Sequence, residues 1–347
     1  MTRTGRLPFP AVPLVLSSYS PPPFLRHGHL ATILSSFRPA PRGSWTGLER
    51  LELPDGDFLD LAWNCPSLAP GSGALRPLAI LCHGLEGSLN ATYIRSTGGT
   101  LVRAGWDVLA WNYRSCGGIP NRRLRSYHSG ETGDLGQVIQ HAARTHSRIV
   151  LIGFSLGGNL VLKYAGEAPP HPAVGAAIAI SAPVDLASCA RALDGRRGNR
   201  LYLRRFLRTL LAKAAAKARQ FPGEIDPARL ARIGTIRAFD EGVTAPLHGF
   251  ASAEDYWARA SALPVLGNLA IPCLLLNAWD DPLLDQPCYP MVVAKAHASL
   301  HLETPAHGGH VGFPDFRQGG QPWYERRILE FLRSHVPESL PVSSVAG

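Results

Sequence analysis

One serine of this chain stands where its neighbours would make it a nucleophile. Ser155 lies in the sequence GFSLGG at residues 153–158, directly after the apolar run at residues 149–152. A serine on a sharp turn between a strand and a helix needs small flanking residues, because larger side chains would collide with both elements. Such a turn exposes the hydroxyl beside a helix N-terminus. The pattern predicts a nucleophilic serine, and a purely structural glycine turn is the alternative.

A nucleophilic serine needs a base, and the base needs an acid that orients it. After the apolar run at residues 273–276 the chain reads NAWDDP at residues 277–282, which places two carboxylates at the carboxyl end of a predicted strand. The usual glycine-x-x-aspartate spacing of such loops maps the acid onto Asp281, and Asp280 is the alternative. A turn formed by Asp-Asp-Pro is compatible with either assignment.

The candidate base is a histidine in a glycine-flanked loop further along the chain. Residues 306–312 read AHGGHVG and follow the last predicted strand, at residues 300–302. From there His310 can reach over the turn at Ser155 and accept its proton. His307 is the alternative base. The chain order serine, acid, histidine is the order found on a parallel α/β sheet with this turn.

A serine that attacks a carbonyl group produces a negatively charged oxygen, the oxyanion. Acyl transfer by this route therefore needs hydrogen-bond donors that stabilise the oxyanion. Residues 81–88 read LCHGLEGS and leave an early predicted strand as a His-Gly loop. We expect the backbone N–H groups of Leu85 and Leu156 to form the oxyanion hole, with His83 shaping the loop.

Short apolar runs that alternate with helical patterns must position these residues. The runs lie at residues 78–82, 108–111, 149–152, 176–180, 273–276 and 300–302. Helices are expected at residues 132–146 and 156–166, and a hairpin at residues 48–53 and 58–63. This alternation predicts an α/β fold whose mostly parallel central sheet is covered by helices on both faces.

One interval is far longer than a crossover helix requires. Nearly ninety residues separate the predicted strands at 176–180 and 273–276. We interpret the excess as a helical cap inserted over the carboxyl ends of the strands, where open parallel sheets bind ligands. The predicted segments are an irregular N-terminal segment at 1–45 with at most a short helix, the core at 46–186 and 263–337, the cap at 187–262, and a tail at 338–347.

Cysteine spacing and the N-terminal residues argue against a zinc-binding, disulfide-rich or secreted protein. The six cysteines, at positions 65, 82, 116, 189, 273 and 288, include no CxxC pair, which argues against a zinc site or a disulfide framework. The proposed chemistry needs no metal and no organic cofactor. Prolines at positions 8, 10 and 13 interrupt the N-terminal stretch, so a signal peptide is not expected. The sequence predicts a cytoplasmic protein.

The chain is basic, with 35 Lys and Arg against 26 Asp and Glu and a net charge of +9. Nucleic-acid binding is not expected, because there is neither a basic tail nor a recognised nucleic-acid motif. Residues 200–219 predict a basic amphipathic helix with an apolar stripe. Its basic residues are Arg200, Arg204, Arg205, Arg208, Lys213, Lys217 and Arg219. We favour an arrangement in which the apolar stripe of this helix packs on its own domain and the arginines face water. Peripheral contact of the helix with an anionic membrane is the alternative.

Motifs spread along the chain resemble those of one branch of the α/β-hydrolases. The matching stretches are residues 24–33, 83–88, 112–118, 127–135, 239–240, 244–250, 255–256 and 308–313. They resemble the YheT-like and EMB8-like proteins and the group of ABHD1, ABHD2 and ABHD3, over about residues 24 to 335. Ala31 and Glu86 depart from the pattern outside the three proposed catalytic positions. The resemblance implies an α/β-hydrolase fold and hydrolysis of carboxylic esters, with acyl glycerols, phospholipids or short-chain esters as substrates of various members.

The residues and the resemblance together predict a serine hydrolase for a small-molecule ester. His310, oriented by Asp281, would deprotonate Ser155 for attack on the ester carbonyl, and water would then release the acyl group. An acyltransferase or a thioesterase would use the same nucleophile. A lipid-binding protein with a silent site is the non-enzymatic alternative, since fold alone does not fix function.

Overall fold

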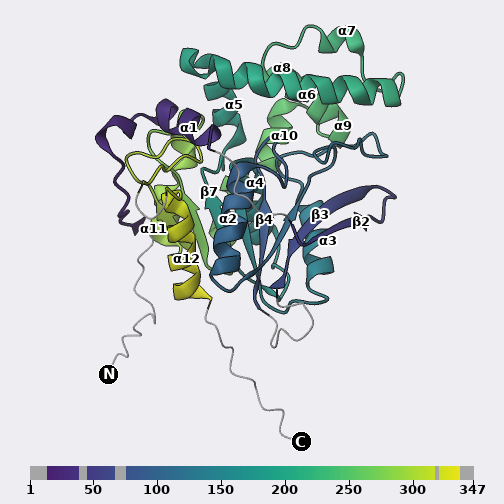
Figure 1. Cartoon of the computed structure of the whole chain (residues 1–347). Helices are drawn as coiled ribbons and strands as arrows, with labels where there is room; N and C mark the ends of the chain where they lie inside the picture. Colours follow the sequence, from purple (N-terminus) through teal and green to yellow (C-terminus); the bar gives the residue numbers. More distant parts are fainter. Residues whose placement is uncertain (1–13, 39–44, 67–75, 317–319, 337–347) are drawn as a thin grey trace, which may run out of the picture.

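The predicted apolar runs form the strands of one central sheet (Figure 1). The computed structural model describes residues 14–38, 45–66, 76–316 and 320–336. Nine strands lie in the order β1-β9-β8-β7-β6-β4-β5-β3-β2. Their bounds are β1 Leu14–Val15, β2 Gly47–Glu52, β3 Phe58–Asn64, β4 Leu78–Cys82, β5 Asp107–Trp111, β6 Ile149–Phe154, β7 Val174–Ile180, β8 Cys273–Leu276 and β9 Leu300–Glu303.

The sheet is mostly parallel, which confirms the predicted fold class. Neighbouring strands from β5 through β4, β6, β7, β8 and β9 run parallel, whereas β2 and β3 form an antiparallel hairpin beside β5. Every residue of β4, β5, β6 and β8 is buried. Continuous burial explains why these strands are apolar apart from Asp107, the first residue of β5, since a parallel sheet is covered on both faces.

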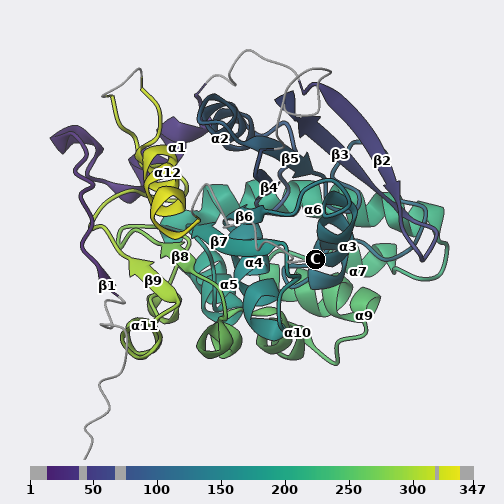
Figure 2. The same cartoon turned by 90° about the horizontal axis from the view of Figure 1, so that it is seen from below.

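Helices cover the two faces of the sheet (Figure 2). On one face the core includes residues of α3 Thr132–Ala142, α4 Leu156–Glu167 and α11 Met291–Ala296. On the other face it includes residues of α2 Thr92–Arg103 and α12 Trp323–His335. The helix expected at residues 132–146 ends at Ala142, where the chain turns toward β6.

Six helices lie over one end of the sheet, between β7 and β8 in the sequence (Figure 1). They are α5 Leu186–Gly195, α6 Arg200–Gln220, α7 Pro227–Leu230, α8 Ile236–Phe239, α9 Ala245–His248 and α10 Ala253–Ala260. Most of their buried apolar residues form a cluster separate from the two clusters beside the sheet, and Cys189 of α5 belongs to one of those two. We call helices α5–α10 the cap. The predicted division of the chain into a core and a cap at 187–262 stays a proposal.

The N-terminal segment is more regular than its composition predicts. Strand β1 pairs in parallel with β9, with Leu14 opposite Leu302, and adds an edge that proline and serine content did not indicate. Helix α1 Gly28–Ser36 follows and is the short helix that the sequence allowed. The predicted tail at 338–347 and residues 1–13 of the predicted irregular segment lie outside the described residues.

Candidate active site

Ser155 occupies a strained turn between β6 and α4. Its φ and ψ are 53° and −119°, and its N–H donates to the carbonyl of Ile180 at 2.8 Å. A Cβ on Gly153 would overlap the carbonyl of Gly157, and a Cβ on Gly157 would overlap the carbonyl of Cys82. Glycine is therefore required at both flanks, because the turn brings backbone against backbone.

The structure brings Ser155, His310 and Asp281 into one hydrogen-bonded series. Ser155 Oγ and His310 Nε2 are 2.8 Å apart. His310 Nδ1 is 2.8 Å from Asp281 Oδ2 and must carry the proton, since a carboxylate only accepts. The Asp281 carboxylate is buried, and its other oxygen accepts the N–H of Leu283 at 2.9 Å. His310 Nε2 is thus left as an acceptor for the serine proton.

Asp280 and His307, the alternative acid and base, lie close to the series formed by Ser155, His310 and Asp281 but do not belong to it. Asp280 Oδ1 accepts the N–H of Gly309 at 2.8 Å, and its Oδ2 lies 3.5 Å from His307 Nδ1. Burial raises the pKa of Asp280 above its usual value. Asp280 therefore holds the backbone of the histidine loop, whereas Asp281 contacts the His310 ring. The geometry thus favours Asp281 and His310 over Asp280 and His307.

The predicted oxyanion loop passes directly beside the serine. A Cβ on Gly84 would lie 3.2 Å from the Cβ of Ser155. The N–H groups of Gly84 and Glu86 donate to the hydroxyls of Tyr93 and Tyr127, at 2.9 and 3.0 Å. Within the described chain, the N–H groups of Leu85 and Leu156 donate to no other group. Both remain available for a developing oxyanion.

His83 shapes this loop, as its position after β4 predicted. Its Nδ1–H donates to the carbonyl of Gly84 at 2.8 Å, and its Nε2 accepts the N–H of Tyr113 at 3.3 Å. Complete burial lowers the pKa of His83 to about 3. The ring is therefore neutral at ordinary pH, and its two nitrogens are occupied by backbone groups.

A mainly apolar cavity opens at Ser155 and His310. Its empty space is about 1210 Å³, a figure that includes open solvent at its mouth. Its apolar walls come from the sheet loops and from the helices above them. They include Leu85, Leu186, Ala190, Leu193, Phe206, Leu210, Ile236, Phe239, Val243, Trp257 and Leu284. Such a chamber suits an apolar group bound next to the serine hydroxyl.

Helix α6 turns its apolar stripe toward the protein, which is the arrangement that the sequence favoured. Leu207 and Ala214 are buried, whereas Arg204 and Arg208 are exposed. Contact of these arginines with an anionic membrane stays a prediction. A bilayer-spanning segment would require a long apolar helix, and none occurs in the described ranges of the chain.

Lys213 of α6 points into the cavity, which its membership of a basic run did not indicate. Its Nζ donates to Glu86 Oε1 at 2.8 Å and contacts Cys116 Sγ at 3.2 Å. Burial opposes the charged amine, but Cys116 and Glu86 together raise the pKa of Lys213 above its usual value. The cap thus contacts the oxyanion loop through an ion pair. The sequence signal for this inward orientation was the position of Lys213 beside the apolar stripe of the helix.

Asp240 gives the cap a pH-dependent stability. The hydroxyl of Thr244 and the indole N–H of Trp257 donate to its two oxygens at 2.7 and 2.8 Å, while burial raises the pKa of Asp240 from 3.8 to about 6. The folded state therefore holds this proton more tightly than the unfolded state. Its stabilising contribution is complete below about pH 4 and is lost as the pH rises through about 6.

Asp240→Asn should therefore stabilise the protein more at pH 7.5 than at pH 4.5, by up to about 2 kcal/mol. Thermal unfolding at both pH values measures the difference between variant and wild type. Glu254→Gln changes an exposed carboxylate of the same cap and should produce no such pH dependence. An equal effect of Asp240→Asn at both pH values would contradict the assignment.

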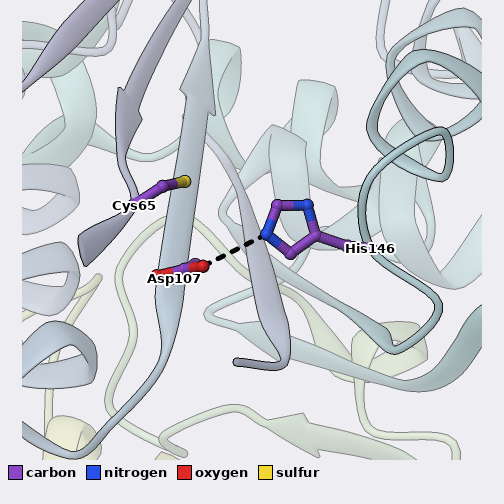
Figure 3. A group of neighbouring side chains, drawn as sticks. All are labelled: Cys65, Asp107 and His146. Atoms are coloured by element: carbon purple, nitrogen blue, oxygen red, sulfur yellow. Dashed lines mark hydrogen bonds and ion pairs between the residues drawn. The ribbon is translucent and has the colours of Figure 1, made fainter. Parts of the chain in front are cut away.

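Among the residues that the structure describes, two groups of side chains have the composition of metal ligands. Figure 3 shows Cys65, Asp107 and His146, whose donor atoms lie within 4.8 Å of one another. Asp107 Oδ2 is 3.2 Å from His146 Nε2, and burial together with the charge of Asp107 raises the pKa of Cys65 to about 12. We interpret this group as a buried hydrogen bond between His146 and Asp107 beside a thiol.

The second group surrounds Glu131 beside the cavity. His128 Nε2 lies 3.2 Å from Glu131 Oε2, and His248 contributes the third donor. The guanidinium of Arg125 also pairs with Glu131. Because Arg125 already supplies a positive charge there, a second cation would be repelled. We interpret this group as a contact between the core and the cap.

Comparison with known proteins identifies the fold family of the chain. A family model described as "alpha/beta hydrolase fold" matches residues 77–316. The chain is 37% identical to "Putative esterase YheT" of Escherichia coli K12, over 83% of this chain and 85% of that protein. It is 27% identical to human "Phospholipase ABHD3", over 93% of this chain and 80% of that protein.

Solved structures show the same fold. The esterase Pf2001 of Pyrococcus furiosus superposes with a TM-score of 0.56 at 18% identity, over 86% of this chain and 96% of that one. Its identity is too low to carry more than the fold. The parallel sheet, the match to the family model and the relatives from bacteria and animals agree: this chain belongs to the α/β-hydrolase fold family, in the branch that contains YheT, EMB8 and ABHD3.

Proposed function

We propose that this protein hydrolyses carboxylic esters through an acyl-enzyme formed on Ser155. The observation that carries the proposal is the continuous series from Ser155 Oγ through His310 to Asp281, with both contacts at 2.8 Å, beside the two unused N–H groups of Leu85 and Leu156. Nucleophile, base, acid and oxyanion donors are the complete set that acyl transfer requires.

The reaction follows from these positions. His310 Nε2 accepts the Ser155 proton as Oγ attacks the ester carbonyl, and the two N–H groups stabilise the oxyanion. His310 then returns the proton to the leaving alcohol. Water, deprotonated by His310, attacks the acyl-enzyme and restores the serine. Asp281 keeps the imidazole in the tautomer that accepts at Nε2.

The cavity supports an ester with a sizeable apolar acyl group. Its walls are apolar next to Ser155, while Glu86 and Lys213 supply a polar corner at one side. An acyl chain bound in the apolar part would gain about 25 cal/mol of binding free energy for each Å² of apolar surface removed from water. The names of the relatives, an esterase and a phospholipase, are consistent with a lipid ester.

A fluorophosphonate probe tests the proposal directly. The wild type should be labelled and Ser155→Ala should not, because the probe traps an activated serine hydroxyl. A panel of p-nitrophenyl esters of increasing acyl length then measures turnover, and activity should increase with acyl length until the cavity is filled. Labelling that persists in Ser155→Ala would exclude this nucleophile. Labelling without ester turnover would favour an acyltransferase, a thioesterase or a lipid-binding role.

A further inference from the structure

The loop that carries His310 has a backbone conformation that it cannot hold alone. Gly309, Val311 and Phe313 have φ values of 62°, 54° and 43°. Glycine adopts this left-handed region readily, but a β-branched residue such as Val311 is an outlier there. Residues in such conformations persist only where surrounding structure fixes them, and they concentrate at functional sites.

Three side chains from three separate elements hold three successive amides of this loop. The N–H of Gly309 donates to Asp280 Oδ1 at 2.8 Å, from the loop after β8. The N–H of His310 donates to Thr32 Oγ1 at 2.8 Å, from α1. The N–H of Val311 donates to Ser181 Oγ at 2.9 Å, directly after β7. The backbone of the histidine is thus held at its own amide and on both sides.

Thr32 is built to accept this bond. Its hydroxyl has one proton, which it donates to the carbonyl of Gly28 at 2.7 Å, so its lone pairs remain for the His310 N–H. A Cβ on Gly309 would lie 2.7 Å from Thr32 Oγ1, and a Cβ on Gly28 would overlap the carbonyl of Asp280. The glycines therefore allow α1 to lie directly against the histidine loop and against the loop of the acid.

We propose that Thr32 is a positioning residue for His310, and that α1 serves to fix the imidazole relative to Ser155. The proposal rests on the proposed hydrolase function. It also gives a role to the stretch at residues 24–33, which supplies no group to the series formed by Ser155, His310 and Asp281. Thr32 acts on the backbone amide of His310, so it contacts neither the substrate nor the reacting atoms.

The test compares Thr32→Val, which keeps the shape and removes the hydroxyl, with Thr32→Ser, which keeps the hydroxyl. We expect Thr32→Val to lower kcat about 10- to 100-fold with little change in KM, because a displaced base affects the chemical step more than binding. Thr32→Ser should restore most of kcat. Ser36→Ala is the matched control, since it removes an exposed hydroxyl-to-carbonyl bond from the same helix. Its kcat should equal that of the wild type.

Hydrogen exchange of the peptide that contains residues 308–313 provides a readout independent of catalysis. It should be faster in Thr32→Val than in Thr32→Ser or the wild type. If Thr32→Val does not fold, Thr32→Ala replaces it in the same comparison. The positioning role would be overturned if Thr32→Val had the kcat and the hydrogen exchange of the wild type. It would also be overturned if Thr32→Ser lost as much kcat as Thr32→Val. If the wild type is neither labelled at Ser155 nor hydrolyses esters, but hydrogen exchange is still faster in Thr32→Val than in the wild type, only the hydrolase proposal is rejected.

Discussion

Asp281→Asn should lower kcat for ester hydrolysis about 10⁴-fold, because asparagine no longer selects the His310 tautomer that accepts the serine proton. The Asp281 carboxylate bonds His310 Nδ1 at 2.8 Å and is buried, so solvent cannot take over its role. An asparagine amide can donate to Nδ1, which would place the ring proton on Nε2, facing Ser155. Steady-state kinetics on a p-nitrophenyl ester measure the effect.

The neighbouring carboxylate provides the matched control. Asp280→Asn keeps an oxygen that can accept the Gly309 N–H, so its loss of kcat should be far smaller than that of Asp281→Asn. The two substitutions are adjacent in sequence and chemically identical, which removes general effects of charge loss from the comparison. A larger loss in Asp280→Asn would assign the acid role to Asp280 and reject the present geometry.

Arg114→Met should lower the free energy of unfolding by about 3–5 kcal/mol, because it leaves buried carboxylates without a counter-charge. The guanidinium is nearly inaccessible, with 3% of its side chain exposed, and pairs with Asp134 through two bonds of 2.7 and 2.8 Å. It also reaches Asp55 and Asp57, at 2.7 and 3.0 Å. One side chain thus joins the β2–β3 turn to helix α3.

Arg122→Met is the control for this substitution, since Arg122 pairs with Glu52 at the surface. Exposed ion pairs contribute little to stability, so its unfolding midpoint should stay close to that of the wild type. Urea unfolding followed by far-UV circular dichroism compares the three proteins. Equal midpoints for Arg114→Met and Arg122→Met would show that the buried network does not carry the expected energy.

The same network explains how distant motifs act together. Arg114 belongs to the stretch at residues 112–118 and Asp134 to the stretch at 127–135, and neither position suggests chemistry by itself. The structure pairs them through two hydrogen bonds from the guanidinium to the carboxylate. These two stretches therefore join parts of the scaffold, whereas the proposed reacting groups lie in residues 153–158 and 308–313.

Sequence alone was sufficient wherever the determining interactions are local or repeat along the chain. Five of the six apolar runs became buried stretches of strand, because burial between two helical layers demands apolar residues at every position. The sixth run, at residues 300–302, also became a strand, although it contains the half-buried His301. The turn at Ser155 was predictable because the two glycines are needed within five residues of each other. The helix at residues 200–220 was evident from its periodicity.

Only the tertiary structure decided the features that depend on direction across long sequence separations. Asp280 and Asp281 are the same residue type, and the loop spacing favoured Asp281 without excluding Asp280. The orientation of β8 and of the histidine loop determines which of them contacts the His310 ring. Lys213 lies in a basic run but turns inward to Glu86, since the rotation of α6 about its axis is fixed by packing. Thr32 meets His310 from 278 residues away. Such contacts arise when a chain folds back on itself, and no local preference of the residues encodes them.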